Sequence, residues 1–184
     1  MGQEIERKFL IKELPENLNE YKCHAMVQGY LNTSPVVRVR KEDDTYYLTY
    51  KGGGLLSRTE YNLPLNEESF NHLVKKADGH VISKKRYEIP YSLENTSYTI
   101  ELDIFEPPFA PLIMAEVEFD SEEAANAFPI PEWFDKEVTY EKETNFGRRC
   151  IRPPCNSLRF HDRNGRHCLP IRPTLIWCLG KTDW

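Results

Sequence analysis

The sequence predicts a mostly β fold, an α+β domain in which antiparallel strands account for most of the chain. Seven segments alternate between apolar and polar residues with the period of two that strands require. Two other segments carry the apolar stripe and the end signals of short helices. Hydrophobic residues make up 40% and aromatic residues 12% of the 184 residues, which is enough for a core.

The predicted strands are 3–11, 36–41, 46–51, 58–65, 82–89, 97–105 and 112–119. In the first of them, Glu4, Glu6 and Lys8 share one face and apolar residues dominate the other. Three consecutive glycines, 52–54, break the third strand, so that 58–65 is expected to return beside it as a hairpin.

Two helices are predicted from their ends and their periodicity. Asn66 is a suitable cap for a helix over 67–78, and Gly79 is a suitable stop. A shorter helix is expected to follow Asp120 and to end at Pro129.

The charge and the cysteines divide the chain near Gly147. Residues 1–146 carry a net charge of −11, whereas residues 147–184 carry +6 and four of the five cysteines. We therefore expect one domain over 1–146, followed by a basic tail containing cysteine and proline over 147–184. The acidic body argues against nucleic acid as a ligand, because phosphate backbones recruit positive surfaces. No apolar run approaches a membrane span, and the first residues, MGQEIERKF, lack a secretory signal, so a cytoplasmic protein is expected.

The unusual feature of the strands is that charges of one sign are grouped on one face. Acidic pairs occur at Glu4 and Glu6, Glu101 and Asp103, and Glu116 and Glu118. Basic pairs occur at Arg38 and Arg40 and at Lys84 and Arg86. The simplest interpretation of any one pair is the solvated outer face of a sheet.

The whole set favours a binding site over a solvated face, because like charges on neighbouring positions repel unless a ligand compensates them. Clustered carboxylates suit a hard divalent cation, and clustered Arg and Lys suit a multiply charged phosphate. A closed barrel could turn this charged face inward and its apolar face toward covering helices, provided that ligand, metal or ion pairs satisfy the interior.

These residues resemble a known family. Glu4-Ile5-Glu6-Arg7-Lys8 matches the ExExK signature of the CYTH superfamily, the triphosphate tunnel metalloenzymes. Further matching pieces follow in the family's order: Arg38 and Arg40, Lys51 before the glycines, Glu60, Lys84 and Arg86, Glu101-Leu102-Asp103, Glu116-Val117-Glu118, and Lys136-Glu137-Val138-Thr139. The resemblance covers residues 2–145, and the run Gln28-Gly29-Tyr30-Leu31 looks most like the bacterial inorganic-triphosphatase branch.

The resemblance implies an eight-stranded antiparallel β-tunnel with a charged interior, flanked by helices. It implies that Mg²⁺ or Mn²⁺ is held by Glu4, Glu6, Glu60, Glu101, Asp103, Glu116 and Glu118. It implies that the triphosphate is bound by Lys8, Arg38, Arg40, Lys51, Lys84, Arg86 and Lys136. Among these, Lys8, Arg38 and Arg40, together with Tyr30 beside Lys8, are the implied catalytic residues.

Two departures from the family pattern stand out. Asn62 occupies a position where relatives often have a second acid, and Thr144 stands near a position where they usually have tyrosine. The glycines after Lys51 lack the order of a phosphate-binding P-loop, so a hairpin turn is expected there. The tail residues Cys150, Cys155, His161, His167 and Cys168 could be considered zinc ligands, but their spacing fits no zinc motif and favours free thiols.

Three functions agree with the sequence. The first, favoured by the branch resemblance, is metal-dependent hydrolysis of inorganic tripolyphosphate by a monomer or homodimer. The second keeps the family but changes the reaction, to an adenylyl cyclase or a nucleoside or thiamine triphosphatase. The third is a non-catalytic polyphosphate-binding domain.

Overall fold

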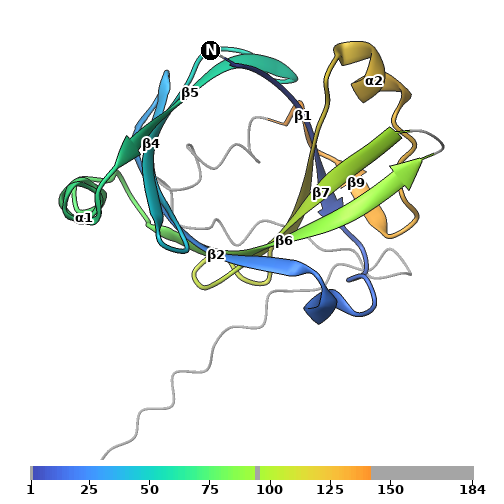
Figure 1. Cartoon of the computed structure of the whole chain (residues 1–184), viewed down its shortest axis with the longest axis horizontal. Coiled ribbons are helices and arrows are strands. Elements are labelled where there is room, and N and C mark those ends of the chain that lie inside the picture. Colours follow the sequence, from blue (N-terminus) through green and yellow to red (C-terminus); the bar gives the residue numbers. More distant parts are fainter. Residues whose placement is uncertain (1, 94–95, 142–184) are drawn as a thin grey trace, which may run out of the picture. The chain divides into compact units, whose positions relative to one another are not determined.

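The computed structural model describes residues 2–93 and 96–141, and these residues form a barrel of strands (Figure 1). The chain divides into two compact units, Met1–Pro154 and Cys155–Trp184, and everything described here belongs to the first. The predicted tail over 147–184, the candidate zinc ligands within it and Thr144 lie outside the described residues. The boundary after Phe146 therefore stays a prediction.

Eight antiparallel strands close the barrel in the order β1-β8-β7-β6-β2-β3-β4-β5, and β5 pairs with β1. The predicted closed eight-stranded antiparallel barrel is thereby confirmed. The barrel strands are β1 (Gly2–Ile11), β2 (Lys22–Thr33), β3 (Val36–Glu42), β4 (Thr45–Lys51), β5 (Ser57–Leu65), β6 (Ile82–Leu93), β7 (Thr96–Phe105) and β8 (Ile113–Glu118). A short ninth strand, β9 (Phe134–Glu137), pairs with the far end of β1, beyond the point where β5 leaves it.

The seven predicted strands are all present, but two strands were not predicted. The sequence of β2 shows its pattern weakly, because Met26 and Gln28 face the interior while Gly29 faces α1 (Glu67–Val74) and the turn that follows it. A Cβ atom at Gly29 would lie 2.7 Å from the Cβ atom of Ala77, so only glycine allows this approach. The other strand, β9, has four residues, too few for alternation to be distinctive.

The two helices lie outside the barrel, as expected, with differences at their ends. In α1, the Asn66 side chain accepts a hydrogen bond from the Ser69 backbone N–H, as a cap should, but the helix ends at Val74 rather than at 78. The chain then continues in tighter turns, with Lys76 N–H donating to the Leu73 carbonyl. In α2 (Glu122–Ala127), the cap is Ser121 and not the predicted Asp120, because the Ser121 hydroxyl reaches the Ala124 backbone N–H.

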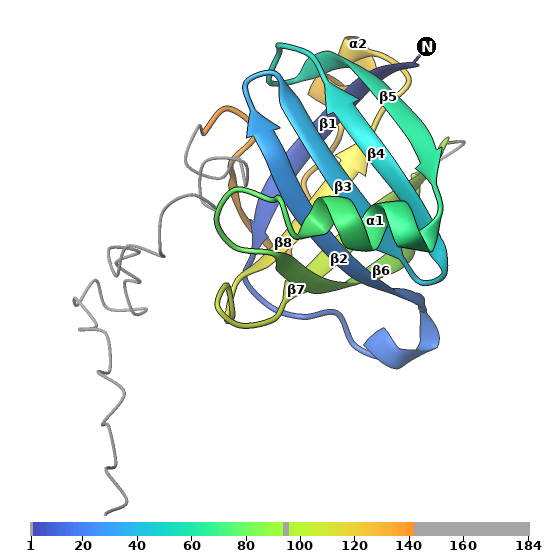
Figure 2. The ribbon, with the colours of Figure 1, turned by 90° about the vertical axis from the view of Figure 1, so that its left-hand side faces the viewer.

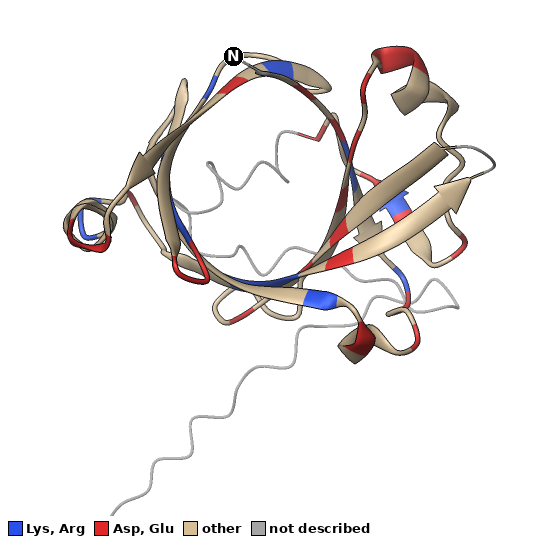
Figure 3. Cartoon of the chain, viewed as in Figure 1, with Lys and Arg blue, Asp and Glu red and all other residues tan. Residues whose placement is uncertain are grey.

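The apolar core lies outside the barrel wall rather than within it. Side chains that point outward from β1, β7 and β8, such as Phe9, Leu102 and Val117, pack against residues around α2, such as Phe128. Figure 2 shows α1 lying across the outer face of β2, β3 and β4. Figure 3 shows that charged positions recur around the barrel wall. Within the described residues, no helix has the length and apolar character to cross a membrane.

Candidate functional site

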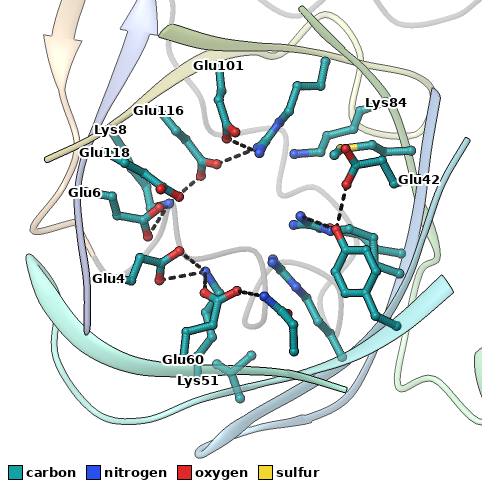
Figure 4. Close-up of a pocket in the computed structure, with 18 of the residues that line it drawn as sticks. Glu4, Glu6, Lys8, Glu42, Lys51, Glu60, Lys84, Glu101, Glu116 and Glu118 are labelled. Carbon is teal, nitrogen blue, oxygen red and sulfur yellow. Dashed lines mark hydrogen bonds and ion pairs between the residues drawn. The ribbon is translucent and has the colours of Figure 1, made fainter. Parts of the chain in front are cut away.

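The interior of the barrel is a cavity of about 210 Å³ lined by side chains from all eight strands, and every strand except β2 contributes charged ones (Figure 4). Thirteen of the residues predicted for the site line it: Glu4, Glu6, Lys8, Tyr30, Arg38, Arg40, Lys51, Glu60, Lys84, Arg86, Glu101, Glu116 and Glu118. Alternation places them there, because every second residue of a strand in a closed barrel faces inward. We call this cavity the tunnel.

On one side of the tunnel, Glu116 of β8 is the centre of a network of ion pairs. Its two carboxylate oxygens contact Lys8 and, at 2.6 Å, the Arg86 guanidinium. Lys8 also lies 2.8 Å from Glu6. Although burial opposes charge on both groups, their attraction raises the pKa of Lys8 and lowers the pKa of Glu116 well below its usual value. Both groups are therefore charged at neutral pH.

A second network joins β1, β4 and β5. The Lys51 ammonium lies 2.6 Å from Glu4 and 2.6 Å from Glu60. Burial favours the neutral acid, but Lys51 outweighs it and lowers the pKa of Glu60 to about 2. The pKa of Lys51 is itself lowered by burial and by the positive charges of Arg38 and Arg58.

Arg58 was missed in the sequence prediction, although it contributes to this network. Its guanidinium donates to Glu4 at 2.8 Å and also contacts Glu6. The signal was available, since Arg58 precedes Glu60 by two residues on the same strand and so shares its face.

Asp103 lies behind the tunnel lining and holds its basic residues in place. It accepts two hydrogen bonds from Arg86, at 2.8 and 2.7 Å, and contacts the Lys84 ammonium. Despite burial, these cations lower the pKa of Asp103. Burial and the neighbouring Arg86 lower the pKa of Lys84 to about 7. As placed, Asp103 supports Arg86 and Lys84 and is not itself part of the lining.

Arg38 and Arg40 of β3 differ from the other cations of the tunnel. In the part of the chain that the structure describes, neither has a carboxylate within 4 Å. Arg40 donates to two neutral groups, the Gln28 side-chain amide oxygen at 3.1 Å and the Tyr47 hydroxyl at 3.2 Å. The buried Nε of Arg38 has no hydrogen-bond partner among the described residues. These two positive charges are therefore held in place without a direct carboxylate contact, although attraction to Tyr30, Glu60 and Glu116 outweighs burial and raises the pKa of Arg38.

Among the carboxylates of the tunnel, Glu118 resembles these arginines in having no partner of opposite charge within ion-pair distance in the described part of the chain. The residue is exposed, but partial desolvation of its carboxyl and repulsion from Glu101, Glu4 and Glu6 raise its pKa to about 7. A divalent cation would relieve this repulsion, and carboxylate oxygens are the donors that Mg²⁺ and Mn²⁺ prefer. Within the described residues, no three carboxylates are already arranged around a common centre, because Lys8 and Arg58 lie between them. The donor set thus fits a cation in its chemistry, while lysine and arginine occupy some of the oxygens.

Lys136 does not join the tunnel, which corrects the sequence interpretation. It lies on β9 with its side chain 63% exposed, paired with Glu141. The segment that contains it instead holds the backbone of Lys8: the Lys8 N–H donates to the Thr139 hydroxyl at 3.0 Å, and the Val138 N–H donates to the Lys8 carbonyl at 2.8 Å. Beside it, Arg7 forms two hydrogen bonds with Glu137, at 2.9 and 2.5 Å.

The Asn62 position supports its neighbours rather than adding a charge. Its amide donates to Glu60 at 2.9 Å and its carbonyl accepts from the Thr49 hydroxyl at 2.7 Å. The glycines after Lys51 form a hairpin turn, as expected, in which Gly54 has a φ of 129°. Lys51 faces the tunnel at the end of β4.

Comparison with known proteins agrees with this geometry. The CYTH domain family matches residues 2–146 of the chain. An inorganic triphosphatase from Nitrosomonas europaea is 39% identical over 144 residues, which cover 76% of this chain and 91% of that protein. An inorganic triphosphatase from Acetivibrio thermocellus is 35% identical over 150 residues, covering 76% and 87%. The crystal structure of the inorganic triphosphatase NE1496 aligns with a TM-score of 0.62 at 34% identity, covering 84% of this chain and 99% of that one.

Proposed function

Because the chain belongs to the CYTH domain family, we propose that it is a metal-dependent triphosphatase that hydrolyses inorganic tripolyphosphate inside the tunnel. The observation that carries the proposal is the pair of buried arginines, Arg38 and Arg40, which have no carboxylate partner among the described residues and face a wall of carboxylates. A polyanion bridged to that wall by a cation would satisfy both sides at once.

The basic side chains bind and orient the substrate. Arg38 and Arg40 offer guanidinium groups, which match phosphate oxygens with paired donors. Lys51, Lys84 and Arg86 are buried and Lys8 is half-buried, and all four contact carboxylates, so a triphosphate can attract them by replacing those partners. Most of the catalysis of phosphoryl transfer is positioning and charge stabilisation, which such preorganised donors supply.

The acidic side chains would hold the cation. Glu4, Glu6, Glu116 and Glu118 are the proposed ligands, with Glu60 and Glu101 close by and Asp103 behind them. When bound, Mg²⁺ or Mn²⁺ would neutralise phosphate charge and lower the pKa of a water molecule that attacks phosphorus.

Phosphate release from tripolyphosphate, ATP and thiamine triphosphate tests the proposal. Each substrate is incubated with Mg²⁺, with Mn²⁺, or with EDTA. We expect tripolyphosphate to be hydrolysed most efficiently and only with a metal ion. Preference for ATP or thiamine triphosphate would show that the substrate is not tripolyphosphate. Formation of cyclic AMP from ATP would show that the reaction is cyclisation and not hydrolysis. Tight binding of tripolyphosphate without turnover would show that the chain is a binding domain.

A further inference from the structure

Arg38 and Arg40 of β3 form what we call the arginine wall of the tunnel, and this wall is short. Val36, Arg38, Arg40 and Glu42 are alternate residues of β3, and all four line the tunnel. Neighbouring members of such a row lie about 7 Å apart. Only the two central members are cations, so the row ends in an apolar side chain at one end and a carboxylate at the other.

Glu42 is tied to the wall without neutralising it. The Tyr47 hydroxyl donates to Glu42 at 2.7 Å and accepts a hydrogen bond from Arg40 at 3.2 Å (Figure 4). Tyr47 therefore fixes the carboxylate beside the arginine while keeping the two charges apart. The side chain of Glu42 is 26% exposed, as expected for the last residue of its strand at a mouth of the barrel.

The surroundings of Glu42 add further negative charge. His24 lies 2.5 Å from Asp43 and 3.2 Å from Glu88 through its two ring nitrogens, and 3.9 Å from Glu42. Lys22 also pairs with Glu88, at 3.2 Å. Three carboxylates share these two groups, so these five side chains together keep a net negative charge even when His24 is protonated.

We propose that Glu42 is a specificity-determining residue that limits the length of the phosphate chain the tunnel accepts. The inference rests on the proposed function and deepens it. A chain bound along Arg38 and Arg40 that extended past Arg40 would bring a further phosphate against the Glu42 carboxylate. A chain extended the other way along β3 would meet Val36, which offers no donor.

The test compares linear tripolyphosphate with linear tetrapolyphosphate for the full chain and its Glu42→Gln variant. The glutamine amide can still accept the Tyr47 hydrogen bond, so the substitution removes charge and keeps position. We expect the ratio of kcat/KM for tetrapolyphosphate to that for tripolyphosphate to rise about tenfold, the scale of one like charge at a partly solvated distance of several ångströms. The wild-type ratio should also rise with ionic strength, because salt screens the repulsion.

Two variants of the same hairpin serve as controls. Asp44→Asn removes an equal charge from an exposed residue that does not line the tunnel, and should leave the ratio within about twofold of wild type. Glu42→Asp keeps the charge and should keep the wild-type preference. Equal ratios in wild type and Glu42→Gln, with no salt effect, would refute the role of Glu42 while tripolyphosphate turnover still supported the proposed function. Absence of wild-type turnover would instead refute the function itself.

Discussion

Replacing Arg38 by alanine tests the central feature of the tunnel, a buried cation with no carboxylate within 4 Å among the described residues. Arg38 is only 8% exposed, and its Nε has no hydrogen-bond partner among the described residues. Removing one preorganised donor to developing charge typically costs about 10²–10³-fold in turnover, or about 2.7–4 kcal/mol of transition-state stabilisation. We expect a loss of that size in kcat/KM for tripolyphosphate.

The same substitution should hardly affect folding. Arg38 loses the packing of its aliphatic stem, but the protein no longer buries a guanidinium without a carboxylate partner. These effects oppose each other, so we expect the free energy of unfolding to change by less than about 1 kcal/mol. Urea unfolding measures it, and phosphate release at equal concentrations of folded protein measures the turnover.

Lys41→Ala is the matched control, because Lys41 lies on the same strand but points outward, with its ammonium 5.5 Å from the Tyr46 ring centroid. Its turnover should stay within about twofold of wild type. Arg38→Lys, which keeps the charge and loses the forked geometry, should fall between wild type and alanine. If Arg38→Ala hydrolysed tripolyphosphate at the wild-type rate, Arg38 would not contact the substrate and the arginine wall would lose its role.

Four other predictions concern the metal, the ion pairs and the chain boundary. EDTA should abolish turnover and Mg²⁺ or Mn²⁺ should restore it, whereas full activity in chelator would refute a metal role. Tripolyphosphate and Ca²⁺ together, under conditions without turnover, should raise the melting temperature by more than the sum of their separate shifts, since a bridging cation couples the two walls; additive shifts would mean independent sites. Glu137→Gln should lower the free energy of unfolding by about 1–3 kcal/mol at pH 7, because Arg7 loses its carboxylate partner and keeps its hydrogen bond to the Ala125 carbonyl. The hydrogen bond from Arg7 lowers the pKa of Glu137 below its ordinary 4.5. The stability difference between wild type and Glu137→Gln should therefore be full above pH 4.5 and should vanish as the pH falls through the lowered pKa. Urea unfolding at several pH values measures it, and a difference that did not change with pH would contradict the role of the ion pair. A chain truncated after Phe146 should still melt cooperatively, because all strands of the barrel precede that residue, and an unfolded product would show that the tail is needed.

Much of the site could be predicted because strand periodicity is local. Once 36–41 is assigned as a strand, Arg38 and Arg40 must share a face whatever the rest of the fold does. The sorting of charges by strand then indicated that this face binds something, and the closed barrel turned it inward. The same reasoning would have included Arg58, which shares a face with Glu60, whereas Glu42 lies one residue beyond the predicted strand 36–41.

The sequence could not show which charges are already paired, because that depends on strands far apart in the chain. Lys51 meets Glu4 only where β5 and β1 close the barrel, and Lys8 meets Glu116 only through the register of β1 and β8. Lys136 shows that a residue can match the family pattern in sequence and still lie outside the tunnel. Strand β9 pairs with β1 beyond the closing strand and so leaves the lysine outside.

The sequence by itself thus determined the faces of the strands and the signs of their charges, since both follow from spacing along one segment. The tertiary structure decided how many of those charges remain available to a ligand. Barrel closure brings distant strands within ion-pair distance, and in the tunnel it pairs Lys51 and Arg58 with carboxylates but leaves Arg38 and Arg40 without a carboxylate within 4 Å among the described residues. Short-range electrostatics therefore depends on closure, and closure is a property of the whole barrel rather than of any one strand.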